Sequence, residues 1–252
     1  MIIIGSVLGL AFLFIIYMLK EAFSNRVLLH HLQFNDQANV SSIRIFFISD
    51  IHRRIIAEKI ISTALGKTDI VIIGGDLAEG NVPLSKVKRN LEKLSQLGPI
   101  YFVWGNNDYE IDINKFEALL LEQHVTILKN TATTHVSSNG LKVNLIGIDD
   151  LAQGEPDLER AINQAEKTGL RLLLSHNPKI IERISELHNI QLVLSGHTHG
   201  GQIRFLGFGM YENGGIKKVG NTLLFVSNGY GTTALPFRLG AKAQTHLITL
   251  SK

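Results

Sequence analysis

Five short, mainly apolar runs along the chain are each followed within a few residues by polar side chains. The runs cover residues 43–47, 69–73, 100–103, 170–174 and 190–194. Their continuous apolar character predicts buried strands, because a strand with both faces covered shows no alternation of apolar and polar positions. Open α/β sheets bind their ligands at the carboxyl ends of the strands. The pattern therefore predicts an α/β fold with a polar site at one edge.

Between these runs lie stretches with the spacing of amphipathic helices, in which aliphatic residues recur three and four positions apart among charges. The stretches cover residues 55–65, 84–97, 113–123, 157–167 and 179–188. Shorter apolar runs at 223–226 and 246–249 predict further strands near the end of the chain. We see no repeat and no low-complexity segment, so the pattern indicates one domain with a substantial core.

The first 19 residues contain no charged residue and are almost wholly apolar. As a helix this segment would be roughly 28 Å long, close to the hydrocarbon thickness of a bilayer. A secretory signal peptide is the main alternative, but no positive residue precedes the apolar run and residues 19–23 lack a clear cleavage site. We therefore expect an uncleaved, single-pass anchor in the cell membrane. The flanking Lys20 and Arg26 predict that the remaining chain faces the cytoplasm.

This organisation predicts three parts: a transmembrane anchor over residues 1–19, a juxtamembrane connector over 20–42 and a globular domain over 43–252. The chain carries a net charge of +3 with a pI near 9.0. These charges are scattered, so they indicate no nucleic acid binding but are compatible with anionic lipids or phosphorylated substrates. The chain has no cysteine, so a disulfide framework is excluded.

The polar residues that follow the five runs are the kinds of side chain that bind metal ions. They are Asp50 and His52, Asp76, Asn106 with Asn107 and Asp108, His176, and His197 with His199. Imidazole is the commonest protein ligand for metals, and a mixed imidazole and carboxylate set without thiolate suits Mn, Fe or Zn more than Ca. The sequence therefore predicts a site for divalent metal, with the identity of the metal left open.

Each of these features also has an ordinary structural explanation. Asp50 could cap a helix, Asp76 could be a turn residue, and residues 106–108 could form a polar loop. Short motif matches carry a real risk of error when taken singly. Because five such features occur in order, we favour the metal site over five independent coincidences.

In their order and spacing these motifs resemble those of the calcineurin-like metallophosphoesterases. The blocks are Asp50-Ile51-His52, Gly75-Asp76, Gly105-Asn106-Asn107-Asp108, His176, and Gly196-His197-Thr198-His199-Gly200-Gly201. The last block looks like a bacterial branch whose members often carry an N-terminal membrane or export segment. The resemblance implies an α/β (α+β) four-layer sandwich of two mixed β-sheets flanked by helices, with the metals at one end.

The resemblance also implies a role for each ligand residue. One metal ion would take Asp50, His52 and His199, and the other Asn106, His176 and His197. Asp76 would bridge the two, since a carboxylate can hold two cations roughly 3.5–4 Å apart. A hydroxide shared by both ions would attack the phosphorus of a phosphorylated small-molecule or lipid-linked substrate.

The chain departs from the family at one position. Asn107 stands where the family has a histidine that protonates the leaving group, and Asp108 follows it; these are the predicted catalytic residues. An amide can hydrogen-bond a phosphate oxygen but has no proton to give away. General acid catalysis is typically worth about 10²–10⁴-fold. We therefore expect slower hydrolysis, with a phosphodiester or pyrophosphate favoured over an alkyl monoester.

Two functions from different classes remain open. The first is a membrane-anchored metal-dependent phosphoesterase, in which Arg238 contacts the substrate phosphate; Arg238 could instead brace the fold. The second is a weakly active or inactive relative that serves as a scaffold for a protein partner. The remaining histidines match no motif and are predicted to be surface or loop residues: His30, His31, His124, His135, His188 and His246. The oligomeric state is not indicated.

Overall fold

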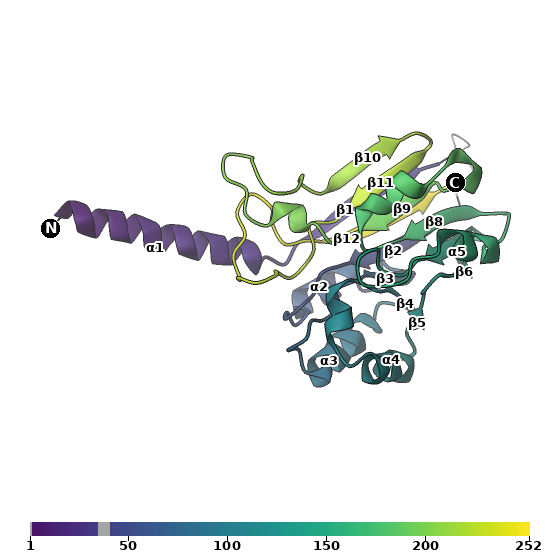
Figure 1. Cartoon of the computed structure of the whole chain (residues 1–252), viewed down its shortest axis with the longest axis horizontal. Coiled ribbons are helices and arrows are strands. Elements are labelled where there is room, and N and C mark those ends of the chain that lie inside the picture. The colour runs from purple at the N-terminus through teal and green to yellow at the C-terminus, as the bar shows by residue number, and fades with distance from the viewer. Residues whose placement is uncertain (1, 35–40) are drawn as a thin grey trace.

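The computed structural model, which describes residues 2–34 and 41–252, contains two six-stranded sheets that face each other (Figure 1). The first sheet has the order β1-β12-β2-β3-β4-β5 and the second the order β10-β11-β9-β8-β7-β6. The first comprises β1 Val27–Gln33, β12 Thr245–Ser251, β2 Ser42–Ile48, β3 Ile70–Gly74, β4 Ile100–Val103 and β5 Thr126–Ile127. The second comprises β10 Gly215–Val219, β11 Thr222–Val226, β9 Leu192–Ser195, β8 Leu170–Leu174, β7 Lys142–Gly147 and β6 Thr131–Val136.

Both sheets are mixed. The strands β2, β3, β4 and β5 run parallel, and β12 pairs antiparallel with β2. In the second sheet β7, β8, β9 and β11 run parallel, while β6 and β10 are antiparallel at the two edges. The five predicted strands, β2, β3, β4, β8 and β9, therefore all lie in parallel regions, which is why they are apolar on both faces.

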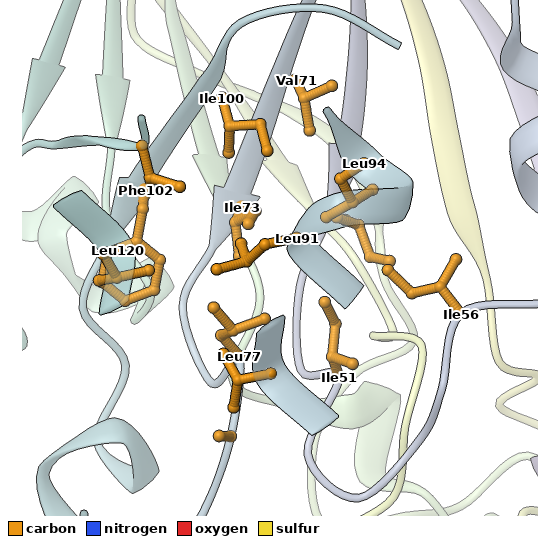
Figure 2. Close-up of a cluster of buried hydrophobic side chains, with 14 of the residues drawn as sticks. Ile51, Ile56, Val71, Ile73, Leu77, Leu91, Leu94, Ile100, Phe102 and Leu120 are labelled. Atoms are coloured by element: carbon orange, nitrogen blue, oxygen red, sulfur yellow. The ribbon is translucent and has the colours of Figure 1, made fainter. Parts of the chain in front are cut away.

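Three apolar cores separate four layers. In β2, Ile45 and Phe47 face the second sheet, whereas Phe46 and Ile48 face the outer helices. The outer core of the first sheet lies under the helices α2 (Glu58–Ala64) and α3 (Leu84–Leu94). It includes Leu91, whose side chain packs toward the strands in Figure 2. A third core covers the outer face of the second sheet under α5 (Leu158–Gln164) and the 3-10 helix η2 (Pro178–Arg183). This arrangement confirms the predicted four-layer sandwich.

The helices are shorter than the sequence pattern predicts. They are α2 Glu58–Ala64, α3 Leu84–Leu94, α4 Ile113–Glu122 and α5 Leu158–Gln164, with short 3-10 helices η1 Asn107–Glu110, η2 Pro178–Arg183, η3 Glu186–His188 and η4 His199–Gly201. The helix predicted over 179–188 is wrong, because two 3-10 turns occupy this range. Ile184 is extended, and Ser185 caps a new turn by a reciprocal bond with His188.

Helix α1 Ile2–Ala22 projects away from the sandwich (Figure 1). Its segment Ile3–Ala22 has a mean hydropathy of 2.2 and no buried residue in its most apolar window, so it is long and apolar enough to cross a membrane. The guanidinium of Arg54 donates to the carbonyl oxygens of Ala22, Phe23 and Ser24 and to the side chain of Asn25. This cation therefore satisfies carbonyls at the carboxyl end of α1 and ties the helix to the domain.

The range 20–42, predicted to be a connector, contains strand β1. This strand pairs in parallel with β12 along its whole length, from Val27 opposite Thr245 to Gln33 opposite Ser251. Its seven residues show mixed burial and only Leu32 is buried, so neither periodicity nor a continuous apolar run marks them as a strand. Residues 35–40 of the predicted connector lie outside the described residues.

Candidate metal centre

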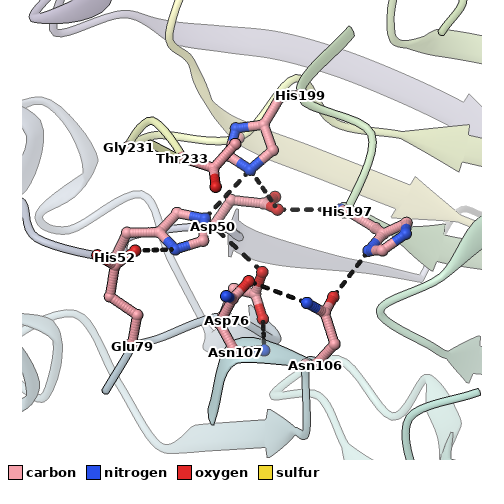
Figure 3. Close-up of polar contacts among 12 residues, drawn as sticks. Asp50, His52, Asp76, Glu79, Asn106, Asn107, His197, His199, Gly231 and Thr233 are labelled. Atoms are coloured by element: carbon pink, nitrogen blue, oxygen red, sulfur yellow. Dashed lines mark hydrogen bonds and ion pairs between the residues drawn. The ribbon is translucent and has the colours of Figure 1, made fainter. Parts of the chain in front are cut away.

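The predicted site residues lie in the loops that follow the carboxyl ends of five strands. Asp50 and His52 follow β2, Asp76 follows β3, and Asn106 follows β4 in the first sheet. His176 follows β8, and His197 with His199 follow β9 in the second sheet. Because both sheets present these ends at the same edge, the side chains converge between them (Figure 3).

Five of these seven residues have a left-handed backbone. They are Asp50, His52, Asp76, His197 and His199, with φ between 49° and 70°. Aspartate and histidine are enriched in this region, but it still costs of order 1 kcal/mol per residue. The loops therefore hold backbone strain at the points where these side chains turn inward, and the surrounding fold maintains this geometry.

One half of the cluster combines two carboxylates with two imidazoles. Ligand atoms of Asp50, His52, Asp76 and His199 all lie within 4.8 Å of one another, and all four residues are buried. His199 Nε2 is 3.1 Å from His52 Nε2 and 3.3 Å from Asp50 Oδ1. Such a group of converging donor atoms could hold a metal ion.

The other half lies on the opposite side of Asp76. His176 Nε2 is 3.3 Å from Asp76 Oδ2, and His197 Nδ1 is 2.9 Å from Asn106 Oδ1. The same Asp76 oxygen is 3.6 Å from His52 Nε2. A single carboxylate oxygen thus approaches imidazoles from both halves of the cluster.

Two further groups fix the orientation of the imidazoles. Glu79 Oε2 lies 3.1 Å from His52 Nδ1, and the carbonyl of Gly74 lies 2.8 Å from His176 Nδ1. Each contact leaves Nε2 turned toward the cluster, and His176 Nε2 is buried without a hydrogen-bond partner. A buried ring nitrogen that faces a carboxylate without a hydrogen bond suits the donor set of a divalent metal ion. Sequence reasoning missed Glu79, because it follows the Gly-Asp motif as an ordinary loop acid.

The carboxylates of the cluster favour the protonated form of two imidazoles. Although burial opposes it, Glu79, Asp76 and Asp50 raise the pKa of His52 above its ordinary value. Burial lowers the pKa of His176, but Asp76 and Asp50 outweigh it and raise that pKa to about 10. Burial, the neighbouring His52 and Arg238 lower the pKa of His199 well below 6.5. Although burial opposes its charge, His176 and His52 hold the pKa of the Asp76 carboxyl below its ordinary value. A divalent cation can replace such protons, because metal ligands must be deprotonated.

The two predicted catalytic residues lie in different surroundings. Asn107 is partly exposed, and its amide donates to Glu110 Oε1 at 2.8 Å. Asp108 is fully buried, and its oxygens accept from the backbone N–H groups of Asp76, Ala78 and Gly105. Burial and the charge of Asp76 raise the pKa of Asp108 to about 7. The structure thus places Asp108 beneath the site, where it joins the β3 and β4 loops as a positioning residue.

Arg238, the predicted substrate contact, has no exposed surface. Its guanidinium donates to the carbonyls of Asn228, Gly231 and Ala241 at 2.6–2.8 Å and lies 3.1 Å from His199 Nδ1. These acceptors occupy its N–H groups, so the geometry favours the alternative that Arg238 braces the loops behind His199. Buried in this way, Arg238 is not positioned to contact a substrate phosphate.

The prediction that His246 lies at the surface or in a loop is wrong. His246 is 1% exposed in β12, where its Nδ1 is 3.1 Å from His30 Nε2 and its Nε2 is 2.9 Å from the hydroxyl of Ser227. Its ring packs against Phe225 between the sheets. Burial, followed by the neighbouring His30, lowers the pKa of His246 well below 6.5. A histidine inside a strand carries no sequence signal of burial.

Comparison with known proteins agrees with this geometry. The family model of the calcineurin-like phosphoesterases matches residues 43–201. An uncharacterized protein of Bacillus subtilis, YpbG, is 42% identical over 92% of this chain and 90% of its own length. A protein of Danio rerio named as a transmembrane protein with metallophosphoesterase domain is 29% identical over 85% of this chain and 54% of its own length.

Among solved structures, the NAD nucleotidase NadN of Haemophilus influenzae aligns with a TM-score of 0.52 and 16% identity. The match covers 76% of this chain and 46% of that one, and at this identity it shows a shared fold alone. The chain thus spans almost the whole Bacillus protein but about half of the other two. From the matched model and the 42% identical relative, this chain belongs to the calcineurin-like phosphoesterase family.

Proposed function

We propose that this protein is a membrane-anchored phosphoesterase that holds two divalent metal ions and hydrolyses a phosphodiester or pyrophosphate bond. The observation that carries the proposal is the position of Asp76 Oδ2, which lies within 3.6 Å of ring nitrogens from both halves of the cluster. An isolated mononuclear site would not need imidazoles on both sides of one carboxylate oxygen.

The ligand roles follow from this division. Asp50, His52 and His199 would hold one ion, and Asp76 would be shared with the second. Asn106, His176 and His197 would complete the second site. When bound, two such ions supply positive charge that lowers the pKa of a water molecule and stabilises a phosphoryl transition state. Oxygen and nitrogen donors without sulfur suit Mn, Fe or Zn.

The amide of Asn107 shapes the choice of substrate. Asn107 lies at the edge of the site, where its backbone N–H donates to Asp76 Oδ1 at 2.9 Å and leaves the side-chain amide as the group to consider. It can hydrogen-bond a phosphate oxygen but cannot protonate a leaving group. A substrate whose leaving oxygen is already a weak base, such as a phosphoanhydride or an aryl ester, loses least from the absence of an acid.

The surroundings of the site support a lipid-linked substrate. A cavity of about 560 Å³ lies between the end of α1 and the site loops. Its apolar wall includes Phe23, Ile55 and Pro236, and its polar wall includes Arg53 and Thr232. Arg53 directly follows the ligand His52, so an amphiphile in this cavity would have its polar end near the metals. The cationic flank of α1 supports a cytoplasmic location for the domain.

Hydrolysis of model substrates by the full chain in detergent micelles tests the proposal. We expect Mn²⁺-dependent cleavage of bis(p-nitrophenyl) phosphate that exceeds cleavage of p-nitrophenyl phosphate and disappears with a chelator and in Asp76→Ala. An Asn107→His variant should gain most on substrates with a strongly basic leaving group. Equal rates on alkyl monoesters and aryl diesters would contradict the substrate preference.

The alternative is a scaffold that binds a protein partner. Its supporting observation is the missing acid at Asn107. The buried cluster argues against it, because a scaffold does not require strained loops that aim four buried ligands at one point. A folded, metal-loaded protein that cleaves neither substrate with any of the three metals would favour the scaffold.

A further inference from the structure

The segment 203–211 exposes apolar side chains beside the end of α1. It contains four large apolar residues that are 67–85% exposed: Phe205, Leu206, Phe208 and Met210. It has no acidic residue, and Arg204 is its one charged residue. Contiguous exposed apolar side chains mark a surface that contacts a membrane or another protein.

The tip of this segment is a tight hairpin with an unusual residue. Phe205 and Phe208 exchange both backbone hydrogen bonds at 2.9 Å, so Leu206 and Gly207 form a two-residue turn. Both turn residues have positive φ, 49° at Leu206 and 87° at Gly207. Asparagine, aspartate or glycine normally occupies the first position of such a turn. Leu206 is both strained and 82% exposed, so the isolated domain gains nothing from a leucine there.

Arg204 makes the hairpin rigid and connects it to the metal centre. Its guanidinium donates to the carbonyls of Gly207 and Tyr211 in the hairpin and to that of Gly200, which directly follows His199. Because these carbonyls accept hydrogen bonds from the Arg204 guanidinium, the positive charge is held within the loop and the outer surface of the hairpin is apolar. The hairpin begins four residues after the proposed ligand His199, so its position and that of the ligand are coupled.

A continuous set of contacts places this hairpin at the level where α1 meets the domain. The backbone N–H of Arg204 donates to the carbonyl of Leu239 at 2.7 Å. The next residue back, Arg238, donates its backbone N–H to the carbonyl of Met18 in the last turns of α1. Lys242 pairs with Glu21 at 3.2 Å. In Figure 1 the yellow-green loop between η4 and β10 lies on the same side of the domain as α1.

We propose that the hairpin 203–211 is a second membrane-contacting element, which inserts Phe205, Leu206, Phe208 and Met210 into the lipid surface beside α1. The occupant is a bilayer because α1, the neighbouring element, is itself exposed, apolar and long enough to span one. The proposal rests on the proposed anchoring by α1. With two contacts, the domain would hold its metal-bearing edge against the headgroup layer, where a lipid-linked phosphate lies.

Single-cysteine labelling of the full chain tests this proposal, since the chain has no native cysteine. The variants Leu206→Cys and Met210→Cys carry an environment-sensitive fluorophore in vesicles of phosphatidylcholine and phosphatidylglycerol. Leu187→Cys is the matched control, because Leu187 is 93% exposed and its neighbour Glu186 contacts Asn221 at the far end of β10. Phe12→Cys reports separately on α1.

We expect emission from the labels at 206 and 210 to shift to shorter wavelength and to be quenched by lipids that carry a nitroxide near the headgroup. The label at 187 should emit as in water. If both hairpin labels emit like the control while the Phe12→Cys label reports hydrocarbon, the hairpin proposal fails and the anchor stands. If the hairpin labels respond but the label at 12 reports water, the anchor fails, and the proposal of a second contact beside α1 fails with it. If none of the labels responds, both the anchor and the hairpin contact fail.

Discussion

Glu79 offers the sharpest test of the metal centre, because it lies outside the predicted ligands. Its Oε2 is 3.1 Å from His52 Nδ1, and the residue is 5% exposed. The close contact with His52, opposed by burial, lowers the pKa of the Glu79 carboxyl, so it is ionised at neutral pH. The contact therefore holds His52 with Nδ1 protonated and Nε2 free for a metal.

Replacing this carboxylate by an amide, Glu79→Gln, keeps the size of the side chain and removes its charge. Loss of such an orienting partner typically weakens metal affinity by about 10–100-fold, or roughly 1.4–2.7 kcal/mol. The amide keeps one oxygen that can accept from His52 Nδ1, so the expected loss comes from the missing negative charge. Because Arg53, the other partner of Glu79, is 61% exposed, that ion pair contributes little to the effect.

Calorimetric titration of Mn²⁺ into the chelator-treated full chain in detergent measures this effect. Glu122→Gln is the matched control, because Glu122 is an exposed glutamate paired with Lys88 at 2.7 Å on the outer helices. We expect weaker binding for Glu79→Gln alone. If Glu79→Gln bound the metal as tightly as the unchanged protein, the proposed role of the Glu79 carboxylate charge would be refuted.

Three further predictions concern pH, loop geometry and the buried acid. Above pH 6.5 His246 is neutral in both the folded and the unfolded state. Below pH 6.5 the unfolded chain binds a proton at this histidine and the folded protein does not, so stability should fall by about 1.4 kcal/mol per pH unit until the lowered pKa is reached. The unfolding temperature of His246→Phe should therefore depend less on pH in this range than that of the wild type, and equal pH dependence would show that another group is responsible. A methyl group in Gly105→Ala would overlap the backbone nitrogen of Asp76, so metal content measured by plasma emission should drop, while Gly215→Ala, with open space around it, should retain metal. Asp108→Asn replaces an acceptor of backbone N–H groups and should cost about 2–3 kcal/mol in chemical unfolding; an unchanged midpoint would contradict its positioning role.

The parts of the site that follow from sequence are those written into short motifs at strand ends. In pairs such as Gly105 with Asn106, the glycine permits the turn after the strand and the next residue supplies the atom that could bind a metal. Because parallel strands end at one sheet edge, order along the chain was enough to predict that the side chains would converge. Their assignment to individual metal ions stays a prediction.

The parts that could not be predicted depend on contacts between distant segments. Glu79 gains its position only when the loop after β3 folds over His52. Arg238 looks like a phosphate ligand in the sequence, yet it is buried behind His199. Strand β1 has no alternation of its own, because its pairing with β12 defines it. Tertiary contacts of this kind leave no local pattern.

The pairing of β1 with β12 changes how a soluble fragment should be designed. A truncation at residue 40, placed to remove the apolar helix, would also remove β1 and leave the whole of β12 as a bare edge strand. Such an edge invites pairing between molecules and aggregation. It would also take away Asn25, which accepts from Arg54 and from the hydroxyl of Tyr230. A fragment that begins near residue 24 keeps β1 paired with β12. Aggregation or inactivity of a shorter fragment would therefore result from the loss of β1 and would say nothing about the activity of the whole chain.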